Sequence, residues 1–229
     1  MPTKDEHTIV ELAYPGEYLS RLGYTETKTC KIRLSRRDQG LLTRMYARKG
    51  YSMQATLSHD FELSSLVVQI DGRAMGTLSV RLDDGHLAAQ EQFPEFIHEL
   101  RGRGARICEI GKLAIDPDIR SKHVLGAIFH IAWLVAFRAR RATDVVIEVN
   151  PRHAAFYQRM LRFERIGSQR MCARVGAPAV LLHISAERGQ DMIRQFGGRQ
   201  RLAATERSFY PYFFHPDDED GLLRRLSGG

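Results

Sequence analysis

The most apolar stretch of the chain, Gly126–Phe137 (GAIFHIAWLVAF), constrains the fold more than any other segment. It contains His130, three arginines follow it within four residues, and it is well short of the roughly 20 residues that cross a bilayer. We therefore expect a helix from about Leu125 to Arg141 that is buried in a protein core, and no membrane span.

Short apolar strands flank this helix on both sides. Arg106–Ile115 precedes it and Asp144–Val149 follows it, and Asp116-Pro117 and Asn150-Pro151 end these strands. The other expected elements, in chain order, are a strand at Lys31–Leu34, a helix from Ser35 to about Lys49, a hairpin of Ser64–Ile70 and Ala74–Leu82 around an Asp71-Gly72 turn, a long polar connection at Asp83–Gly104, a short helix at His153–Leu161, and paired strands at Phe163–Arg174 and Pro178–Ser185. This order predicts an α/β (α+β) fold with a mixed sheet and helices on both faces.

The 229 residues suggest one main domain with an extension at each end. Residues 1–30 show weak periodicity and are expected to form an arm, residues 31–185 carry the expected strands, and residues 186–229 add a helical segment and an aromatic cluster. The three cysteines lie far apart and form no Cys-x-x-Cys pair. This pattern favours a reducing, cytoplasmic location and excludes a disulfide scaffold and a zinc finger.

The loop before the core helix is basic, with Arg120, Ser121, Lys122 and His123 in succession. A helix start offers free N–H groups and the positive end of the helix dipole, which together favour an anion. We therefore expect a phosphate site here, with an ordinary capped helix as the alternative. No GxGxxG motif follows a strand and no GxxxxGK[ST] motif occurs, so a nucleotide cofactor is not expected. The net charge of +7 is spread along the chain and does not indicate nucleic-acid binding.

A second stretch, Asp144–Phe163 (DVVIEVNPRHAAFYQRMLRF), places Asn150 after a buried strand and Tyr157 on the helix that follows. Together with the basic loop, it resembles the GNAT superfamily of N-acyltransferases. The resemblance implies a mostly antiparallel, twisted sheet whose two central parallel strands splay around a pantetheine arm. The residues that it assigns to the donor are the strand backbone of Leu113, Ala114 and Ile115, the phosphate loop of Arg120, Ser121, Lys122, His123, Val124, Leu125 and Gly126, and Asn150 near the thioester.

The loop departs from the usual [RQ]xxGx[GA] pattern, because His123 and Leu125 stand at the glycine positions and Gly126 comes one residue late. Arg162 likewise stands where the family has a glycine before Phe163. A left-handed helix end at Arg162 would cost on the order of 1 kcal/mol.

A closer resemblance accounts for these departures. The strand CEIGKLAI resembles that of acyl-homoserine-lactone synthases, and the block from Arg106 to Ile184 is similar to long-chain N-acyl amino acid synthases. The resemblance implies transfer of a fatty acyl group from acyl carrier protein to the amine of an amino acid. The co-substrate is then acyl-phosphopantetheine or acyl-CoA, with no tightly bound cofactor. The arm of the carrier has a single phosphate, so that a loop poor in glycine suits it.

The catalytic roles fall to Glu109 and Tyr157. Glu109 shares its face of an apolar strand with Ile107 and Leu113, so that burial would raise its pKa into the range of a useful base; the alternative is a Glu on the solvent side. Tyr157 is the candidate acid for the departing sulfur, with a core tyrosine as the alternative. Glu148 is a weaker candidate base. Lys112 would point away from Glu109 unless a bulge at Gly111 turns it.

Three further expectations concern the surroundings of the site. The apolar helix face could line an acyl tunnel or simply pack in the core; its residues are Ile128, Ile131, Trp133, Leu134, Val135 and Phe137. An acidic carrier protein is expected to dock on Arg120, Lys122, Arg138, Arg140 and Arg141. No metal site is expected, and covalent catalysis by Cys108 or Cys172 is disfavoured because no histidine is placed by the sequence to activate them.

Two other functions fit the same sequence. One is a GNAT acetyltransferase that uses acyl-CoA on a small amine or a protein lysine. The other is a module that keeps the fold and binds an acyl carrier or a lipid without catalysis.

Overall fold

The computed structural model describes residues 6–15, 26–35, 63–119 and 121–227. The helix expected from Ser35 to about Lys49 lies, apart from its first residue, outside the described residues.

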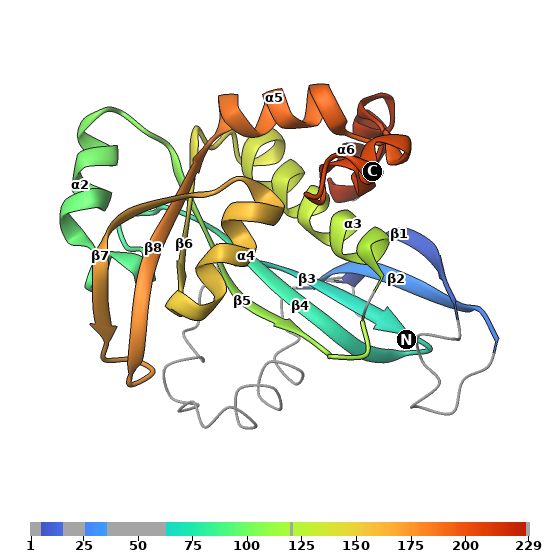
Figure 1. Ribbon diagram of the computed structural model, residues 1–229, viewed down its shortest axis with the longest axis horizontal. Coiled ribbons are helices and arrows are strands. Elements are labelled where there is room, and N and C mark those ends of the chain that lie inside the picture. Colours follow the sequence, from blue (N-terminus) through green and yellow to red (C-terminus); the bar gives the residue numbers. More distant parts are fainter. Residues whose placement is uncertain (1–5, 16–25, 36–62, 120, 228–229) are drawn as a thin grey trace.

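The described strands form one sheet in the order β1-β2-β3-β4-β5-β6-β8-β7 (Figure 1). Their bounds are β1 Glu6–Tyr14, β2 Lys28–Ser35, β3 Leu63–Ile70, β4 Arg73–Leu82, β5 Ile107–Ile115, β6 Asp144–Val149, β7 Glu164–Cys172 and β8 Ala177–Ser185. All neighbours are antiparallel except β5 and β6, which are parallel. The predicted mixed, mostly antiparallel sheet with a central parallel pair is therefore confirmed.

The helices connect the strands and complete the C-terminal part of the chain. They are the 3-10 helix η3 Ala88–Glu91, α2 Pro94–Gly102, α3 Lys122–Trp133 with the π-helical turn η4 Leu134–Ala139, α4 Pro151–Leu161, α5 Ala186–Phe196, the 3-10 turns η5 Gln200–Ala204, η6 Tyr210–Tyr212 and η7 Pro216–Asp218, and α6 Glu219–Leu226.

Two apolar clusters pack against opposite faces of the sheet. The larger one joins α3, α4 and the C-terminal segment (residues 186–227) to one face, through side chains such as Ile128, Tyr157 and Phe213. The smaller one packs η3 and α2 on the other face, where Phe93 and Ile97 belong to the same cluster as the β5 and β6 side chains. Helices therefore cover both faces, as the order of elements predicted.

The hairpin turn at Asp71-Gly72 has positive φ at both positions, 52° and 75°, as the tight two-residue connection requires. Two elements differ from the prediction. Residues 6–14, expected within an arm, form the edge strand β1 and pair with β2. The core helix begins at Lys122, earlier than expected, because the side chain of Ser121 accepts the N–H of Val124 and caps it.

The helical run Lys122–Ala139 has the length and hydropathy of a membrane span, and 61% of it is buried inside the protein. Burial of this extent is typical of the core helix of a globular protein.

Candidate active site

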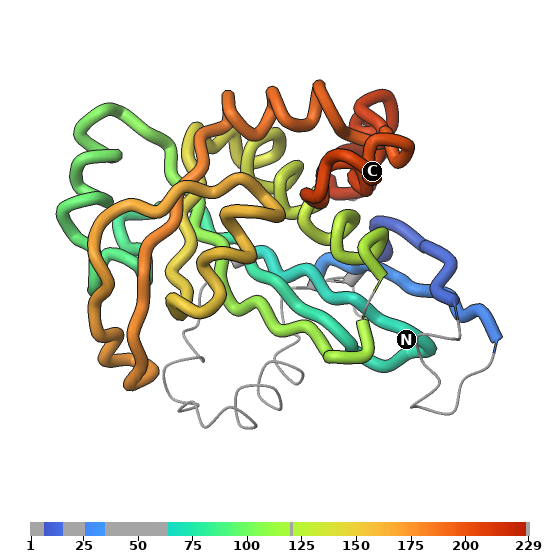
Figure 2. The backbone as a smooth tube through the Cα atoms, viewed as in Figure 1, coloured from blue at the N-terminus to red at the C-terminus, as the bar shows by residue number. Residues whose placement is uncertain are grey.

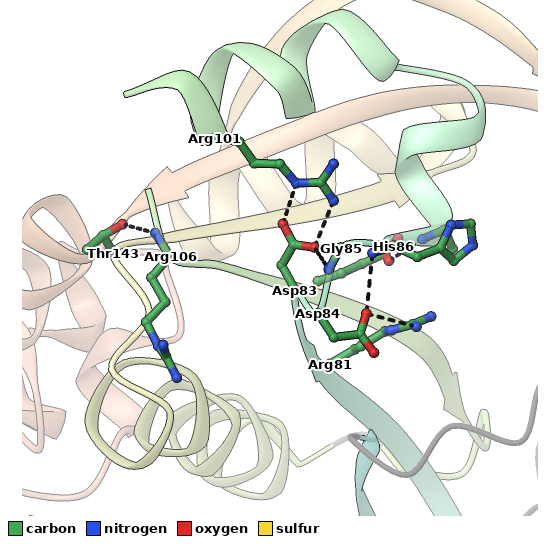
Figure 3. Close-up of polar contacts among 10 residues, drawn as sticks. Arg81, Asp83, Asp84, Gly85, His86, Arg101, Arg106 and Thr143 are labelled. Atoms are coloured by element: carbon green, nitrogen blue, oxygen red, sulfur yellow. Dashed lines mark hydrogen bonds and ion pairs between the residues drawn. The ribbon is translucent and has the colours of Figure 1, made fainter. Parts of the chain in front are cut away.

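β5 and β6 are hydrogen-bonded only near their first residues. The parallel ladder covers three consecutive residue pairs and ends at Glu109 and Val146. Just before it, Oγ1 of Thr143 accepts the N–H of Arg106 at 3.0 Å (Figure 3). The N–H of Thr143 also donates to the carbonyl oxygen of Arg106 at 2.8 Å. The later residues of the two strands continue without pairing to each other, so the strands diverge (Figure 1). The opening is closed at the Arg106 end and widens towards the strand ends.

The far side of the opening is shaped by a bulge in β5. Against β4, the register shifts by one residue between Gly111 and Ala114, which leaves Lys112 and Leu113 opposite a single residue of β4. Lys112 adopts a left-handed conformation with φ of 50°. A bulge of this kind turns side chains away from strict alternation. The bulge that would turn Lys112 is therefore present. Within the described part of the chain, no strand pairs with the β6-facing edge of β5 at Leu113–Ile115.

Glu109 lies at the last paired position of β5, where the opening begins. Its Oε2 accepts the N–H of Ala88 at 2.8 Å and its Oε1 accepts the N–H of Ala89 at 2.9 Å, which places the carboxyl group at the start of η3. The residue is buried, with 8% of its surface exposed. Burial raises the pKa of Glu109 to about 7, against the lowering effect of the two backbone hydrogen bonds. A carboxyl group with this pKa is suited to take a proton at neutral pH.

Arg174, which the sequence analysis did not single out, lies in the same charged group. Its Nη2 is 2.7 Å from Oε2 of Glu148, and its Nε is 3.0 Å from Oε2 of Glu91. The charge of Glu148 raises the pKa of Glu109 and the charge of Arg174 lowers it. Glu148 is thus the ion-pair partner of Arg174, which disfavours it as a base. These residues come from four separate parts of the chain, so no local pattern predicts that they meet.

A second ion pair fixes the connection between β4 and α2, on the same side of the sheet. Asp83 accepts two hydrogen bonds of 2.7 Å from Nε and Nη2 of Arg101 (Figure 3). Burial acts to raise the pKa of Asp83, but the hydrogen bonds from Arg101 and from the N–H of Gly85 outweigh it and lower the pKa. The pair anchors α2, and with it the η3 turn whose N–H groups hold Glu109.

Tyr157 belongs to the cluster on the α3 side of the sheet and is 8% exposed. Its ring contacts those of Phe156 and Phe163 edge to face, at centroid distances of 5.2 and 6.4 Å. Glu109 bonds to η3 on the other side. The two catalytic candidates therefore lie on opposite faces of the sheet, on either side of the diverging strands.

Asn150 has a structural task that the resemblance did not imply. Its Oδ1 accepts the N–H of Arg152 at 3.2 Å and caps α4. The other end of α4 is left-handed at Arg162, with φ of 61°. The helix thus ends as the family pattern has it, although without glycine.

The start of α3 presents Lys122 and His123 as exposed side chains. Nζ of Lys122 lies 5.6 Å from the ring centroid of Tyr212, and the His123 ring packs edge to face on the same tyrosine at 5.0 Å. Nδ1 of His123 is also 3.4 Å from the side-chain nitrogen of Gln200. Arg120, the residue that matches the family loop, lies outside the described residues.

The predicted phosphate loop is shorter than expected. The N–H of Leu125 donates to the carbonyl oxygen of Ser121 at 3.1 Å, and the side chain of Val124 is buried in the core. Gly126 is buried too, and a Cβ atom there would lie 2.7 Å from the carbonyl oxygen of Tyr212. Gly126 is therefore needed for the close approach of the C-terminal segment. Phosphate binding by these three residues stays a prediction, and Lys122 and His123 are the exposed members of the loop.

The predicted carrier surface extends over a long helical run. Lys122 begins α3 and Arg138 lies in η4, about 24 Å further along at 1.5 Å per residue. Arg138 is also paired with Glu219 at 2.9 Å. Arg138, Arg140 and Arg141 come shortly before β6 in the chain. They are therefore near the end where β5 and β6 are paired. Docking of an acidic carrier on these residues therefore stays a prediction.

The residues of the predicted acyl tunnel fall into two groups. Trp133 and Phe137 line a small apolar cavity beneath α3. The other four side chains of that prediction pack in the core; they are Ile128, Ile131, Leu134 and Val135. The cysteines are buried, and burial raises the pKa of Cys108 to about 12, which leaves it without the thiolate that covalent catalysis needs.

The fold is similar to that of solved N-acyltransferases. The structure of FeeM, an N-acyl amino acid synthase from uncultured soil microbes, matches with a TM-score of 0.65 and 19% identity over 74% of this chain and 97% of that chain. An uncharacterised protein (bh2621) from Bacillus halodurans matches with a TM-score of 0.50 and 12% identity over 81% of this chain and 95% of that one. No curated protein sequence matches the chain.

A family profile adds a match at the level of sequence. The profile of N-acyl amino acid synthase FeeM matches residues 39–185, more than half of the chain and nearly all of the predicted main domain. The chain therefore belongs to the N-acyl amino acid synthase FeeM family, and it is an N-acyltransferase with a GNAT-like fold.

Proposed function

We propose that the protein transfers a fatty acyl group from the thioester of acyl carrier protein to the α-amine of an amino acid. The observation that carries this proposal is the opening between β5 and β6, with the buried Glu109 at its closed end. A pantetheine arm is narrow and carries amide groups, and the unpaired edge of β5 offers backbone partners to such amides. The thioester would then lie where the strands begin to diverge, beside Glu109.

In the proposed reaction, Glu109 acts on one side of the sheet and Tyr157 on the other. The amine of the acceptor approaches from the α2 side, and Glu109 takes one of its protons. The nitrogen then attacks the thioester carbon, the carbon–sulfur bond breaks, and the thiolate receives a proton from Tyr157 on the α3 side. The products are an amide and a free thiol, and both side chains return to their starting states by exchange with water.

The choice of a carrier-linked donor rests on the start of α3. Leu113–Ile115 would pair with the arm, and Lys122 and His123, together with Arg120, would hold its phosphate. Because Gly126 is covered by Tyr212 and glycine is otherwise missing from the loop, close backbone approach to a diphosphate is disfavoured. One phosphate suits this loop better than the diphosphate of coenzyme A.

The proposal is tested by offering the purified protein acyl carrier protein and coenzyme A thioesters of the same chain length, each with all common amino acids. Mass spectrometry should detect N-acyl amino acids from the carrier thioester, and Glu109→Gln should abolish most of this product. Acetyl transfer to a small amine or a protein lysine without any fatty product would favour a coenzyme A-dependent acetyltransferase instead. A wild-type protein that binds the carrier thioester without turnover would contradict the proposal.

Two further predictions accompany the proposed function. Residues 31–185 are the predicted acyltransferase domain and residues 186–229 an added segment; because β1 and β2 belong to the same sheet, we extend the domain towards the N-terminus to include both strands. The protein works in the cytoplasm, in line with its free cysteines.

A further inference from the structure

Arg81 and Glu109 are direct neighbours on two adjacent strands. In the antiparallel register of β4 and β5, Arg81 lies opposite Glu109. Residues paired in this way carry their side chains on the same face of a sheet, with Cβ atoms about 4.5–5.5 Å apart. Glu109 bonds to η3 on that face, so Arg81 also projects towards the η3 side. The side chain of Arg81 is 13% exposed, so it is largely buried and is still reached by solvent.

The connection from β4 to α2 contacts both side chains. It follows shortly after Arg81 and leads to η3 (Figure 2). Nη2 of Arg81 lies 3.5 Å from Oδ1 of Asp84, and the same oxygen accepts the N–H of His86 at 3.3 Å (Figure 3). Further along the connection, the first two N–H groups of η3 donate to the carboxyl group of Glu109. One short segment therefore fixes the guanidinium group and the carboxyl group relative to each other.

The charges on the two sides of Glu109 differ. On the β6 side, Arg174 lies 2.7 Å from Glu148 and 3.0 Å from Glu91. With one positive and two negative side chains, this group carries a net negative charge and repels a further anion. On the β4 side, Arg81 brings a positive charge, and its partner Asp84 is 45% exposed, so water screens that pair. An anionic group beside Glu109 is therefore favoured on the side of Arg81.

An α-amino acid matches this arrangement. Its amine and its carboxylate are bonded to the same carbon, so the groups that hold them must lie side by side, as Glu109 and Arg81 do. A guanidinium group has five N–H donors in a planar fork, so it can bind a carboxylate through two of them and still contact Asp84. A carboxylate bound at Arg81 would place the amine of the same molecule next to Glu109.

We propose that Arg81 binds the carboxylate of the acceptor and thereby selects α-amino acids over amines that lack a neighbouring carboxylate. This inference rests on the proposed function. The acceptor then contacts β4 through its carboxylate and β5 through its amine. Amines without a carboxylate are poor acceptors, and so are amino acids whose carboxylate lies several carbons away from the amine.

The test compares the best α-amino acid acceptor with the amine that has the same side chain and no carboxylate. The ratio of kcat/KM for these two acceptors should fall by about 10- to 100-fold in Arg81→Gln, because a charged, hydrogen-bonded contact is lost. Arg81→Lys keeps the charge without the planar fork and should give a smaller fall. Asp84→Asn is the matched control. It removes the charge that Arg81 contacts, its Oδ1 can still accept the N–H of His86, and it should keep the ratio.

A second measurement is independent of turnover. The common amino acids and their matching amines are titrated against wild-type protein and Arg81→Gln by isothermal calorimetry. A loss of amino-acid binding in Arg81→Gln that spares the amine would support the inference even if wild-type protein formed no N-acyl product, an outcome that would overturn only the proposed function.

Three outcomes would overturn the inference. The first is an unchanged ratio in folded Arg81→Gln or Arg81→Lys while wild-type protein acylates amino acids, which would leave the proposed function standing. The second is an equal fall of the ratio in Asp84→Asn, which would show that Arg81 acts only by holding the connection. The third is wild-type protein that binds no amino acid more tightly than the matching amine.

Discussion

Nε2 of His130 lies 3.3 Å from Oε1 of Glu219, in the interior between α3 and α6. The other ring nitrogen accepts the N–H of Phe214, so it carries no proton, and Nε2 must carry the proton that is shared with Glu219. His130 is therefore neutral when all these hydrogen bonds are made.

His130→Phe should lower the free energy of unfolding by about 1–3 kcal/mol, because it leaves the N–H of Phe214 and an oxygen of Glu219 without their partner. Burial also lowers the pKa of His130, so the folded protein binds fewer protons than the unfolded chain. The wild-type protein should lose this part of its stability as the pH falls below about 6.5. Urea unfolding at several pH values measures the stability loss in His130→Phe and the pH dependence of the wild-type protein. His98→Phe, on the exposed face of α2, is the control. Equal losses in the two variants would contradict the role of His130.

Glu109→Gln should reduce acyl transfer by about 100- to 10,000-fold, because the amide does not accept the proton of the amine. Turnover with a saturating amino acid measures the loss, and a melting curve shows whether the variant is folded. Glu99→Gln, an exposed carboxyl change on α2, should leave turnover unchanged. A folded Glu109→Gln variant with undiminished turnover would remove Glu109 from the mechanism.

The activity of the wild-type protein should rise with pH as a single ionisation centred at about 7, the pKa to which burial raises Glu109. The contribution of Glu109 to stability should fall as the pH rises. Between 4.5, the ordinary value, and about 7, the unfolded chain has lost this proton while the folded protein keeps it. The contribution of Glu109 to the free energy of unfolding should therefore fall by about 3 kcal/mol as the pH rises through this window, against the gain from His130. Measurements of turnover and of urea unfolding across this pH range test the two expectations. In Glu109→Gln, the fall of the free energy of unfolding with rising pH should be absent.

Tyr157→Phe should slow transfer from an alkyl thioester by about 10- to 100-fold, because the departing thiolate loses its acid. The loss should disappear with an aryl thioester, whose thiolate leaves without protonation. Phe156→Leu, the neighbouring change on α4, serves as control. An equal loss with both kinds of thioester would indicate that Tyr157 supports the fold only.

Lys122→Glu should lower kcat/KM for the carrier-linked donor by about 10-fold, because it places a negative charge where the phosphate is expected to bind. Transfer from an acyl-pantetheine that lacks the phosphate should be unaffected. Arg194→Glu on α5 is the control, since it makes the same charge change on an exposed helix. An equal effect on both donors would contradict a phosphate site at Lys122.

Local patterns were sufficient for much of the fold. β6 has the predicted bounds of Asp144–Val149, because a short apolar strand before Asn-Pro leaves little choice. Strand alternation placed Glu109 on the side of Ile107, and the structure buries both. The main omission was β1, whose alternation is interrupted by a register shift between Thr8 and Val10.

Local sequence patterns do not predict contacts between distant segments of the chain. Arg174 meets Glu148 and Glu91 only after β6, β7 and η3 are packed together. The family resemblance assigned Gly126 to the phosphate loop, while the structure places it against Tyr212, 86 positions later in the chain. The carrier surface was likewise predicted from charge alone, and charge does not give the separation of Lys122 and Arg138 along the helical run.

The short ladder between β5 and β6 also bears on how the molecule behaves without its substrate. Only three residue pairs join β5 to β6, and beyond Glu109 and Val146 the facing edges of the two strands are not paired to each other, although β5 still pairs with β4 and β6 with β8. On the proposed function, the amide-bearing arm of the donor takes the place of the missing strand. The bound substrate would then pair with backbone groups of its own enzyme. Amide hydrogens on the facing edges of β5 and β6 should therefore exchange with solvent more slowly once the substrate is bound.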